Sequence, residues 1–322
     1  MNTRKPRGGA TGADSPEPEL AEPELAEPIF RAGFVTFVGR PNVGKSTLTN
    51  ALVGEKVAIT SSKPQTTRRA IRGIVHRASG QLIVVDTPGM HRPRTLLGER
   101  LNAVVQDTLG DVDVIGFCVP ANEPIGPGDR FINEQLENFS RTRKIAIVTK
   151  IDAAGPTRVA EQLLAVSQLR EWDLVIPLSA VTGDQVDLLA EQVIALMPES
   201  PALYDDDAVT DESTNDRVAE LIREAALEGV SDELPHSLAV TIDEMSERSP
   251  GGVLDIFANV WVERDSQKGI IIGHRGSRLT DVGTRARVEI EQLLGQRVYL
   301  KLHVKVAKEW QRDPKQLGKL GF

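Results

Sequence analysis

Residues 39–46, Gly-Arg-Pro-Asn-Val-Gly-Lys-Ser, place two glycines, a lysine and a serine at a spacing that can bind phosphate. They match the pattern G-x-x-x-x-G-K-[ST] with no mismatch. Such a loop needs glycine because its backbone N–H groups turn inward around a phosphate, where side chains would block them. We expect Lys45 to bring positive charge to the outer phosphates and Ser46 to offer its hydroxyl to Mg²⁺. The nucleotide contacts expected in this stretch are Gly39, Arg40, Pro41, Asn42, Val43, Gly44, Lys45, Ser46 and Thr47.

A second group of residues could hold the metal ion and the terminal phosphate. Residues 86–89 read Asp-Thr-Pro-Gly. Asp86 is placed to hold Mg²⁺ through a water molecule, and the Gly89 N–H can meet the terminal phosphate. In the polar stretch 61–68, Thr67 is our choice to close over Mg²⁺ when a third phosphate is present, with Thr66 the next candidate. We therefore assign catalysis to Lys45, Ser46, Thr67, Asp86 and Gly89, and further nucleotide contacts to Thr87, Pro88 and Met90.

Residues 149–152, Thr-Lys-Ile-Asp, could read the base of the nucleotide. A carboxylate at Asp152 can accept hydrogen bonds from N1–H and N2–H₂ of guanine, whereas adenine lacks that pair of donors. An ATPase would keep the phosphate loop but would leave Asp152 unexplained. The stem of Lys150 can lie along the base plane, and the Ala180 N–H can reach guanine O6. The residues expected at the base are Thr149, Lys150, Ile151, Asp152, Ser179 and Ala180.

Each of these motifs follows a short apolar run that is typical of a buried strand, and helical patterns separate the runs. Alternation of apolar strands with helices predicts an α/β domain, in which helices cover both faces of a mostly parallel sheet. Ligands of such sheets bind at the carboxyl ends of the strands, where the motifs lie. The predicted strands are residues 33–38, 70–76, 82–86, 114–120, 144–149 and 174–178, and the predicted helices are 45–53, 96–108, 130–139, 159–168 and 186–196.

With all five motifs in this order, residues 30–203 resemble a P-loop GTPase domain of the Era family. Residues 59–68, Ile-Thr-Ser-Ser-Lys-Pro-Gln-Thr-Thr-Arg, resemble the family's first switch segment. One residue departs from the family pattern, because Thr149 stands where Asn is usual. Threonine keeps a hydroxyl but lacks the amide that bridges guanine N7 and the phosphate loop. We still expect guanine specificity, because Asp152 is the residue that reads the base.

The sequence predicts slow intrinsic hydrolysis of GTP to GDP and phosphate. Many GTPases place Gln after the Asp-X-X-Gly motif to orient the attacking water, but this chain has Met90, which cannot do so by hydrogen bonding. The arginine candidates for stabilising the transferred phosphoryl group are Arg68, Arg92 and Arg94. Asn42 matches the Asn with which relatives bind K⁺, so K⁺ is a second candidate cofactor beside Mg²⁺.

A different motif stands near the end of the chain, where residues 273–276 read Gly-His-Arg-Gly. A G-x-x-G loop between two helices lets a nucleic-acid backbone approach closely, because neither glycine has a side chain. Residues 264–322 hold 13 Lys and Arg against 6 Asp and Glu, whereas the whole chain has a net charge of −8. A basic end on an acidic protein indicates an anionic partner. The expected RNA contacts are Ile272, Gly273, His274, Arg275, Gly276, Arg278 and Arg285.

The order helix, strand, strand, helix, loop, helix, strand over residues 215–308 resembles an α+β type II KH domain, as Era proteins have. The predicted strands are 237–242, 254–262 and 298–306, with a long helix over 279–294. The resemblance implies that the protein binds the 3′ end of small-subunit ribosomal RNA and acts in assembly of the small ribosomal subunit. A KH groove holds about four nucleotides of single-stranded RNA.

The N-terminal stretch and an acidic stretch between the two domains indicate where the domains begin and end. Residues 1–28 are rich in Pro and Glu and have few large apolar side chains, which predicts a disordered tail. Residues 205–233 hold 11 acidic and 2 basic side chains, and the first part is typical of an exposed linker. We assign 29–203 to the GTPase domain, 204–216 to the linker and 217–322 to the KH domain with its extension. The single cysteine, Cys118, lies in an apolar run and is expected to be a buried structural thiol.

Two other functions remain open at this point. The chain could be an RNA-binding protein whose nucleotide is mainly a structural ligand, which release of phosphate over many turnovers would exclude. It could also be a GTPase of the membrane surface, because a basic segment can meet anionic lipid as well as RNA. No apolar run approaches the roughly 18 residues that span a membrane. We expect a cytoplasmic monomer, with weak peripheral association at the inner face of the cell membrane as a secondary property.

Overall fold

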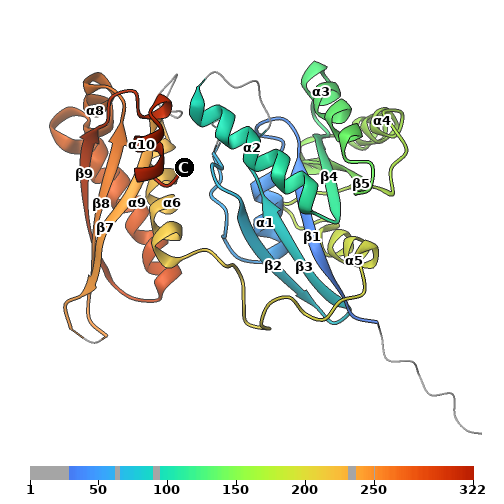
Figure 1. Cartoon of the computed structure of the whole chain (residues 1–322), viewed down its shortest axis with the longest axis horizontal. Coiled ribbons are helices and arrows are strands. Elements are labelled where there is room, and N and C mark those ends of the chain that lie inside the picture. Colours follow the sequence, from blue (N-terminus) through green and yellow to red (C-terminus); the bar gives the residue numbers. More distant parts are fainter. Residues whose placement is uncertain (1–28, 62–65, 90–94, 231–236, 250) are drawn as a thin grey trace, which may run out of the picture.

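The computed structural model describes residues 29–61, 66–89, 95–230, 237–249 and 251–322. It contains two sheets that lie side by side, with helix α6 between them and the N-terminal end of α2 reaching toward the second domain (Figure 1). The predicted tail over residues 1–28 lies outside the described residues. The strands are β1 Arg31–Val38, β2 Ile71–Arg77, β3 Gly80–Asp86, β4 Val114–Pro120, β5 Arg143–Thr149, β6 Leu174–Pro177, β7 Ala239–Glu247, β8 Leu254–Val262 and β9 Val298–Val306.

The helices of the first domain are α1 Lys45–Val53, α2 Leu96–Asp111, α3 Pro127–Gln135, α4 Pro156–Ser167 and α5 Val186–Leu196. Those of the second are α6 Thr214–Leu227, α8 Asp265–Ile272, α9 Ser277–Leu294 and α10 Pro314–Lys319. Short 3₁₀ turns cover Leu136–Asn138, Ile151–Ala153, His274–Gly276 and Trp310–Arg312.

The first sheet has the strand order β2-β3-β1-β4-β5-β6, in which only β2 is antiparallel to its neighbour. Every residue of β3 and β4 is buried, as expected for strands covered on both faces. Leu48 of α1 and Leu189 of α5 pack in one apolar cluster, while Val105 of α2 and Ile132 of α3 pack in another. The α/β fold class predicted from the apolar runs is confirmed.

The second sheet has the order β7-β8-β9, with β7 antiparallel and β9 parallel to β8. Its buried face packs against α6, α8 and α9 through residues such as Ile222, Ile271 and Ile290. The parallel pairing of β8 with β9 requires the helical crossover that α8 and α9 provide. This arrangement confirms the predicted α+β KH fold.

Local differences from the prediction have identifiable causes. Helix α3 begins three residues earlier than expected because Pro127 suits the first turn of a helix, and the side chain of Asp129 accepts from the Gly126 N–H at 2.8 Å. Helix α6 begins at Thr214, inside the expected linker, where the Ser213 side chain caps it. The α10 helix was not predicted, because six residues are too few to show a helical period.

The acidic linker is more ordered than its composition indicates. Asp205, Asp206 and Asp207 are exposed as expected. Further along, the Ile74 N–H donates to the carbonyl of Val209 at 2.9 Å, and Arg72 pairs with Asp211 at 2.7 Å. The linker therefore runs along the outer edge of the first sheet, beside β2.

Segment 59–68 and helix α6 make direct polar contacts between the two domains. The Thr60 N–H donates to Oε1 of Glu224 at 2.9 Å, and Lys56 pairs with the same carboxylate at 2.6 Å. Arg223, which is 1% exposed, donates to the carbonyl of Thr66. The stretch that resembles a first switch segment is thus bonded to the domain that carries the G-x-x-G loop.

Cys118 provides a direct probe of the first core. Its thiol is fully buried in β4, and burial raises the pKa of this thiol to about 12. Because the thiolate is the reactive form, we expect no measurable alkylation of the native protein at pH 7.5. Labelling should appear only with global unfolding, followed by mass spectrometry across a urea titration. Rapid labelling without denaturant would contradict the burial of this strand.

Candidate functional site

The phosphate loop connects β1 to α1 in a conformation that needs its glycines. Gly44 has φ of 102°, in the left-handed region that favours glycine. A Cβ atom at Gly39 would lie 2.6 Å from the carbonyl oxygen of Cys118, so β4 leaves no room for a side chain there. Asn42 also has a positive φ, 65°, which asparagine tolerates better than most residues. The loop therefore presents backbone groups at the start of α1, where the helix dipole favours an anion.

Lys45 is held inside this loop. Its Nζ donates to the carbonyl oxygens of Gly39 and Arg40, each at 3.1 Å. Burial lowers the pKa of Lys45 below the usual lysine range, and the Asp86 carboxylate opposes that shift. The ammonium is thus fixed at the mouth of the loop, where it can bond an outer phosphate.

Ser46, Thr67 and Asp86 come together from three parts of the chain. The Ser46 hydroxyl donates to Oδ2 of Asp86 at 2.8 Å, and the Thr67 hydroxyl donates to the same oxygen at 3.0 Å. The two hydroxyl oxygens lie 3.1 Å apart. Burial raises the pKa of Asp86, while the bonds from Ser46 and Thr67 and the charge of Lys45 oppose the rise.

This oxygen-rich cluster fits Mg²⁺. Oδ1 of Asp86 is buried and has no hydrogen-bond partner within the described part of the chain. A buried carboxylate oxygen without a partner is costly, and a hard cation with its bound water would satisfy it. Two hydroxyls and a carboxylate are the ligand types that Mg²⁺ prefers.

The base end of the site is built on the ends of β5 and β6. The Ser179 hydroxyl donates to Oδ1 of Asp152 at 2.6 Å, which orients the carboxylate. In turn Oγ of Ser179 accepts from the backbone N–H groups of Val181 and Thr182. Ser179 therefore has a positioning role that its motif alone does not indicate.

Thr149 ties the base end to the phosphate loop. Its buried hydroxyl donates to the carbonyl of Val43 at 2.7 Å, and Nζ of Lys150 donates to the carbonyl of Asn42 at 2.5 Å. The hydroxyl thus makes a bond across the two loops, although it lacks the amide that the family pattern carries. The structure brings β5 and the phosphate loop together despite this substitution.

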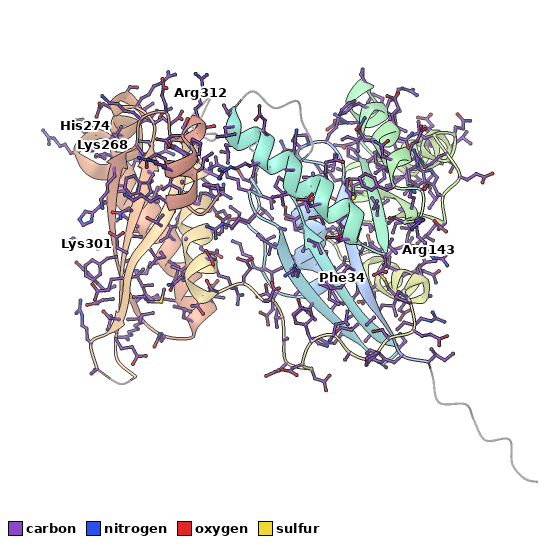
Figure 2. The ribbon with its side chains drawn as sticks, viewed as in Figure 1. Phe34, Arg143, Lys268, His274, Lys301 and Arg312 are labelled. Carbon is purple, nitrogen blue, oxygen red and sulfur yellow. The ribbon has the colours of Figure 1, made fainter. Side chains whose placement is uncertain are left out.

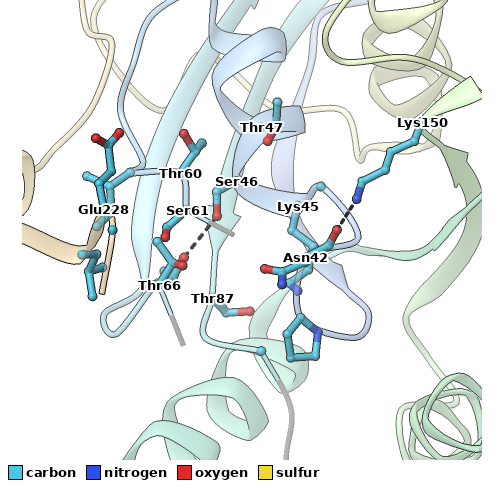
Figure 3. Close-up of a pocket in the computed structure, with 17 residues that line it drawn as sticks. Asn42, Lys45, Ser46, Thr47, Thr60, Ser61, Thr66, Thr87, Lys150 and Glu228 are labelled. Atoms are coloured by element: carbon cyan, nitrogen blue, oxygen red, sulfur yellow. Dashed lines mark hydrogen bonds between the residues drawn. The ribbon is translucent and has the colours of Figure 1, made fainter. Parts of the chain in front are cut away.

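A cavity of about 590 Å³ opens at the phosphate loop and extends to Lys150, but Asp152, Ser179 and Ala180 are not among the residues that line it (Figure 3). Its walls include the predicted residues Pro41, Asn42, Gly44, Lys45, Ser46, Thr47, Thr67, Thr87, Gly89 and Lys150. It also includes residues outside the predicted site, which are Ile59, Thr60, Ser61, Leu227, Glu228 and Gly229. Leu227 is the last residue of α6, and Glu228 and Gly229 follow it, more than a hundred residues from the phosphate loop, so no local motif could place them there. Met90, His91, Arg92 and Arg94 lie outside the described residues.

Arg68 does not face the cavity. Its Nη1 donates to the carbonyl of Leu238 at 2.6 Å, and its guanidinium lies 5.8 Å from the ring centroids of Trp310 and Phe322. Arg68 is 3% exposed. In this structure Arg68 stabilises the contact between the domains. It is therefore not placed to stabilise the transferred phosphoryl group, as the sequence had suggested.

The G-x-x-G loop lies between α8 and α9 and exposes its two central side chains. Gly273 and Gly276 have φ of 72° and 82°, and His274 and Arg275 are exposed between them. A Cβ atom at Gly273 would lie 2.7 Å from the Cβ of Arg278. The turn therefore requires glycine and leaves an open approach for a backbone. Figure 2 shows His274 on the side of the second domain that faces away from the first.

Arg278 and Arg285 differ from the other expected RNA contacts. Arg278 donates to the carbonyls of Glu228 at 2.8 Å and Gly229 at 3.3 Å, and Arg285 forms ion pairs with Glu228 and Asp281. The C-terminal end of a helix carries partial negative charge, which favours cations there. Both guanidinium groups are thus directed at the end of α6 rather than displayed beside the loop.

Comparison with known proteins gives two family matches and close full-length relatives. Residues 34–150 match the model of a 50S ribosome-binding GTPase, and residues 233–311 match a KH domain. The chain is 69% identical to the GTPase Era of Leifsonia xyli over 294 residues, which cover 91% of this chain and 99% of the relative. It is 63% identical to that of Mycolicibacterium smegmatis with the same coverage.

The chain belongs to the Era family of GTPases. Identity of this extent over nearly the whole length of the relatives includes both domains, so the resemblance drawn from the motifs is confirmed. The family also establishes that the protein is an enzyme, a GTPase. The cavity around Lys45 is accordingly the candidate GTP site.

Two solved Era structures share the fold of this chain. One is Era in complex with MgGDPNP and nucleotides 1506–1542 of 16S ribosomal RNA, at 36% identity and a TM-score of 0.87 over 91% of this chain and 99% of that one. The other is an Aquifex aeolicus Era variant bound to GDP and AlF₄⁻, at 35% identity and a TM-score of 0.86 over 90% and 99%. Among the helices of the described ranges, none has the length and apolar character needed to cross a bilayer.

Proposed function

We propose that this Era-family GTPase is a switch that binds the 3′ end of small-subunit ribosomal RNA and acts in assembly of the small ribosomal subunit. One observation supports a switch most strongly. The wall of the GTP cavity includes Glu228 and Gly229, and both residues are bonded by Arg278 from the helix that follows the G-x-x-G loop. The RNA assignment is supported by the Era complex with 16S ribosomal RNA.

The proposed chemistry relies on positioning and charge. Ser46, Thr67 and Asp86 are the residues that would hold Mg²⁺, which neutralises charge on the outer phosphates when bound. Lys45 would exchange its bonds to two loop carbonyls for bonds to phosphate oxygens, and the Gly89 N–H would meet the terminal phosphate. Thr67 directly follows Thr66, whose carbonyl accepts from Arg223 of α6, so we expect movement of Thr66 away from α6 to displace Thr67 from this group.

The coupling between GTP and RNA is proposed to run through two contacts. Segment 59–68 is bonded to α6 by Thr60 and Thr66, and the end of α6 is bonded to α9 by Arg278 and Arg285. A ligand shifts an equilibrium only if it binds one state better. A third phosphate that draws Thr67 toward Mg²⁺ would therefore alter the support of the G-x-x-G loop, and RNA at that loop would alter the GTP site in return.

Crosslinking the protein to RNA in cells and sequencing the bound segments tests the RNA assignment. We expect reads concentrated at the 3′ end of small-subunit ribosomal RNA. A variant that carries His274→Ala and Arg275→Ala is the control, because it removes both exposed side chains of the loop while keeping both glycines. Reads spread evenly over messenger RNA would contradict the proposal.

A monovalent cation is a further element of the proposed mechanism. Asn42 lies in the cavity wall beside Lys45, and we propose that it helps to bind K⁺ there. We expect turnover in KCl to exceed that in NaCl by about tenfold, a modest share of the 10³ to 10⁵ that an arginine finger contributes elsewhere. The Asn42→Ala variant should lose this difference. Equal rates of phosphate release by the parent protein in both salts would exclude the role.

A further inference from the structure

The face of the second sheet that points away from α6, α8 and α9 carries a row of basic and aromatic side chains. On β9, the exposed residues Tyr299, Lys301, His303 and Lys305 alternate with buried or half-buried ones. Their partners on β8 are Asp255, Phe257, Asn259 and Trp261. Lys301 lies 5.9 Å from the ring centroid of Phe257. None of these residues belongs to the G-x-x-G loop or to its two helices.

A cavity of about 280 Å³ opens on this face. Lys305 and Lys319 each lie 5.4 Å from the ring centroid of Trp261, so two ammonium groups converge at one side chain of the cavity wall. Asp243 is the acidic residue of the cavity wall, and its carboxylate lies 3.8 Å from Nζ of Lys305. Two lysines against one carboxylate leave a net positive charge that favours an anionic ligand.

Asn259 supplies an independent indication of a ligand. It is 1% exposed and lines the cavity, and its Oδ1 has no hydrogen-bond partner among the residues that the structure describes. Its Nδ2 donates to the carboxylate of Asp243, which fixes the orientation of the amide because a flipped oxygen would face that carboxylate. The residues of the cavity wall therefore include a buried acceptor that lacks a donor.

We propose that this cavity is a ribonucleotide subsite on the outer face of the KH sheet, and that RNA passing the G-x-x-G loop continues around β9 to reach it. A ribonucleotide carries both complementary groups, a phosphate for Lys305 and Lys319 and a sugar hydroxyl that can donate to Asn259. Aromatic rings interleaved with lysines are typical of surfaces that follow a single strand. This subsite rests on the proposed RNA-binding function.

The placement of β9 supports this path. In the described residues β9 pairs only with β8, so its other edge is free. Figure 2 shows Lys268, His274 and Lys301 along the side of the second domain that faces away from the GTPase domain. Because β9 runs parallel to β8 and α8 follows the end of β8, Lys305 lies toward the end of the sheet that carries the G-x-x-G loop, and Lys301 lies farther from it. A strand that leaves the loop near His274 and turns around the edge of β9 can therefore reach the cavity at Lys305. The acids on this face, Asp243, Glu244 and Asp255, lie on β7 and β8 rather than on β9.

RNA affinities of a double variant, Lys305→Ala with Lys319→Ala, test the subsite. The long probe is RNA of nucleotides 1506–1542 of 16S ribosomal RNA, and the short probes are truncations down to the roughly four nucleotides that a KH groove holds. We expect the double variant to bind the long probe about tenfold more weakly, with a slope of log affinity against log salt reduced by about 0.7 to 1.4. Affinity for the shortest probe should not change. Lys315→Ala, also exposed on α10 but outside the cavity, is the matched control.

Single 2′-deoxy substitutions in the long probe test the contact to Asn259 without altering the protein. At one position beyond the four nucleotides of the groove, loss of the hydroxyl should weaken binding to the parent protein about threefold to tenfold. Unchanged affinity of the double variant for the long probe would overturn the subsite. The subsite would also be overturned if the double variant lost binding to small subunits but kept its RNA affinity, because that result would indicate an acidic protein partner. Failure of the parent protein to bind any probe would instead contradict the proposed function.

Discussion

The Lys45→Ala variant is expected to lose GTP turnover, with kcat lower by about a thousandfold or more. Lys45 is buried, and its ammonium is fixed 3.1 Å from two carbonyls at the mouth of the phosphate loop. Removal of one preorganised group that stabilises charge in a transition state typically costs 10² to 10³ in rate. Loss of ground-state contacts to the phosphates adds to this effect. Phosphate release over many turnovers at saturating GTP and Mg²⁺ measures the result.

A Lys45→Met variant separates charge from packing, because methionine keeps an unbranched apolar stem in the buried position. It should lose turnover as fully as the alanine variant while its thermal unfolding stays close to that of the parent. Lys308→Ala, an exposed lysine of the second domain, should retain the parent rate. Turnover that survives both substitutions at Lys45 would exclude the site described here as the place of hydrolysis.

The Asp152→Asn variant is expected to bind GTP about a thousandfold more weakly and to prefer XTP. The Asp152 carboxylate can accept from both N1–H and N2–H₂ of guanine, whereas an asparagine offers one acceptor and places an N–H₂ donor against guanine N2–H₂. Sites that leave a buried polar group unpaired reject a ligand by factors of this order. Xanthine carries a carbonyl at that position, so the new amide can donate to it.

Ser179 makes this exchange of specificity feasible. Its hydroxyl donates to Oδ1 of Asp152 at 2.6 Å and can donate equally to the oxygen of an asparagine, which leaves the amide nitrogen toward the base. Asp184→Asn is the matched control, because Asp184 is exposed in the same loop and accepts from Thr182. Competition between labelled GTP and unlabelled XTP gives the ratio of affinities. An unchanged ratio in Asp152→Asn would contradict the role of Asp152 in reading the base.

Contiguous motifs allowed most of the GTP site to be predicted from the sequence. Spacing alone placed Lys45 and Ser46, and the order of strands placed Asp86 at the same edge of the sheet, where the structure brings its carboxylate to 2.8 Å from Ser46. The apolar runs also predicted the strand β4 with its correct bounds. Short-range patterns succeed here because glycine-rich turns and buried parallel strands impose strong local requirements on residue type.

Contacts between the domains could not be predicted in this way. Glu228 and Gly229 enter the wall of the GTP cavity because α6 packs beside segment 59–68, and no local pattern encodes that packing. Packing between elements also decides the contacts of Arg278 and Arg285. Their basic character predicts RNA contacts, but in the structure both bond Glu228 at the end of α6. Arg68 belongs to the stretch that resembles a switch segment, which made it a candidate for the phosphoryl group. In the structure its guanidinium lies against the rings of Trp310 and Phe322 instead.

We propose that the GTP site and the G-x-x-G loop are coupled through α6. Titration of the parent protein with RNA of nucleotides 1506–1542, in saturating Mg²⁺ with either GDPNP or GDP, tests it most directly. We predict that RNA binds about tenfold more tightly in the presence of GDPNP, within the range of 5 to 150 typical of coupled sites. By reciprocity, RNA should tighten GDPNP binding relative to GDP by the same factor. Equal RNA affinity with the two nucleotides would contradict the account.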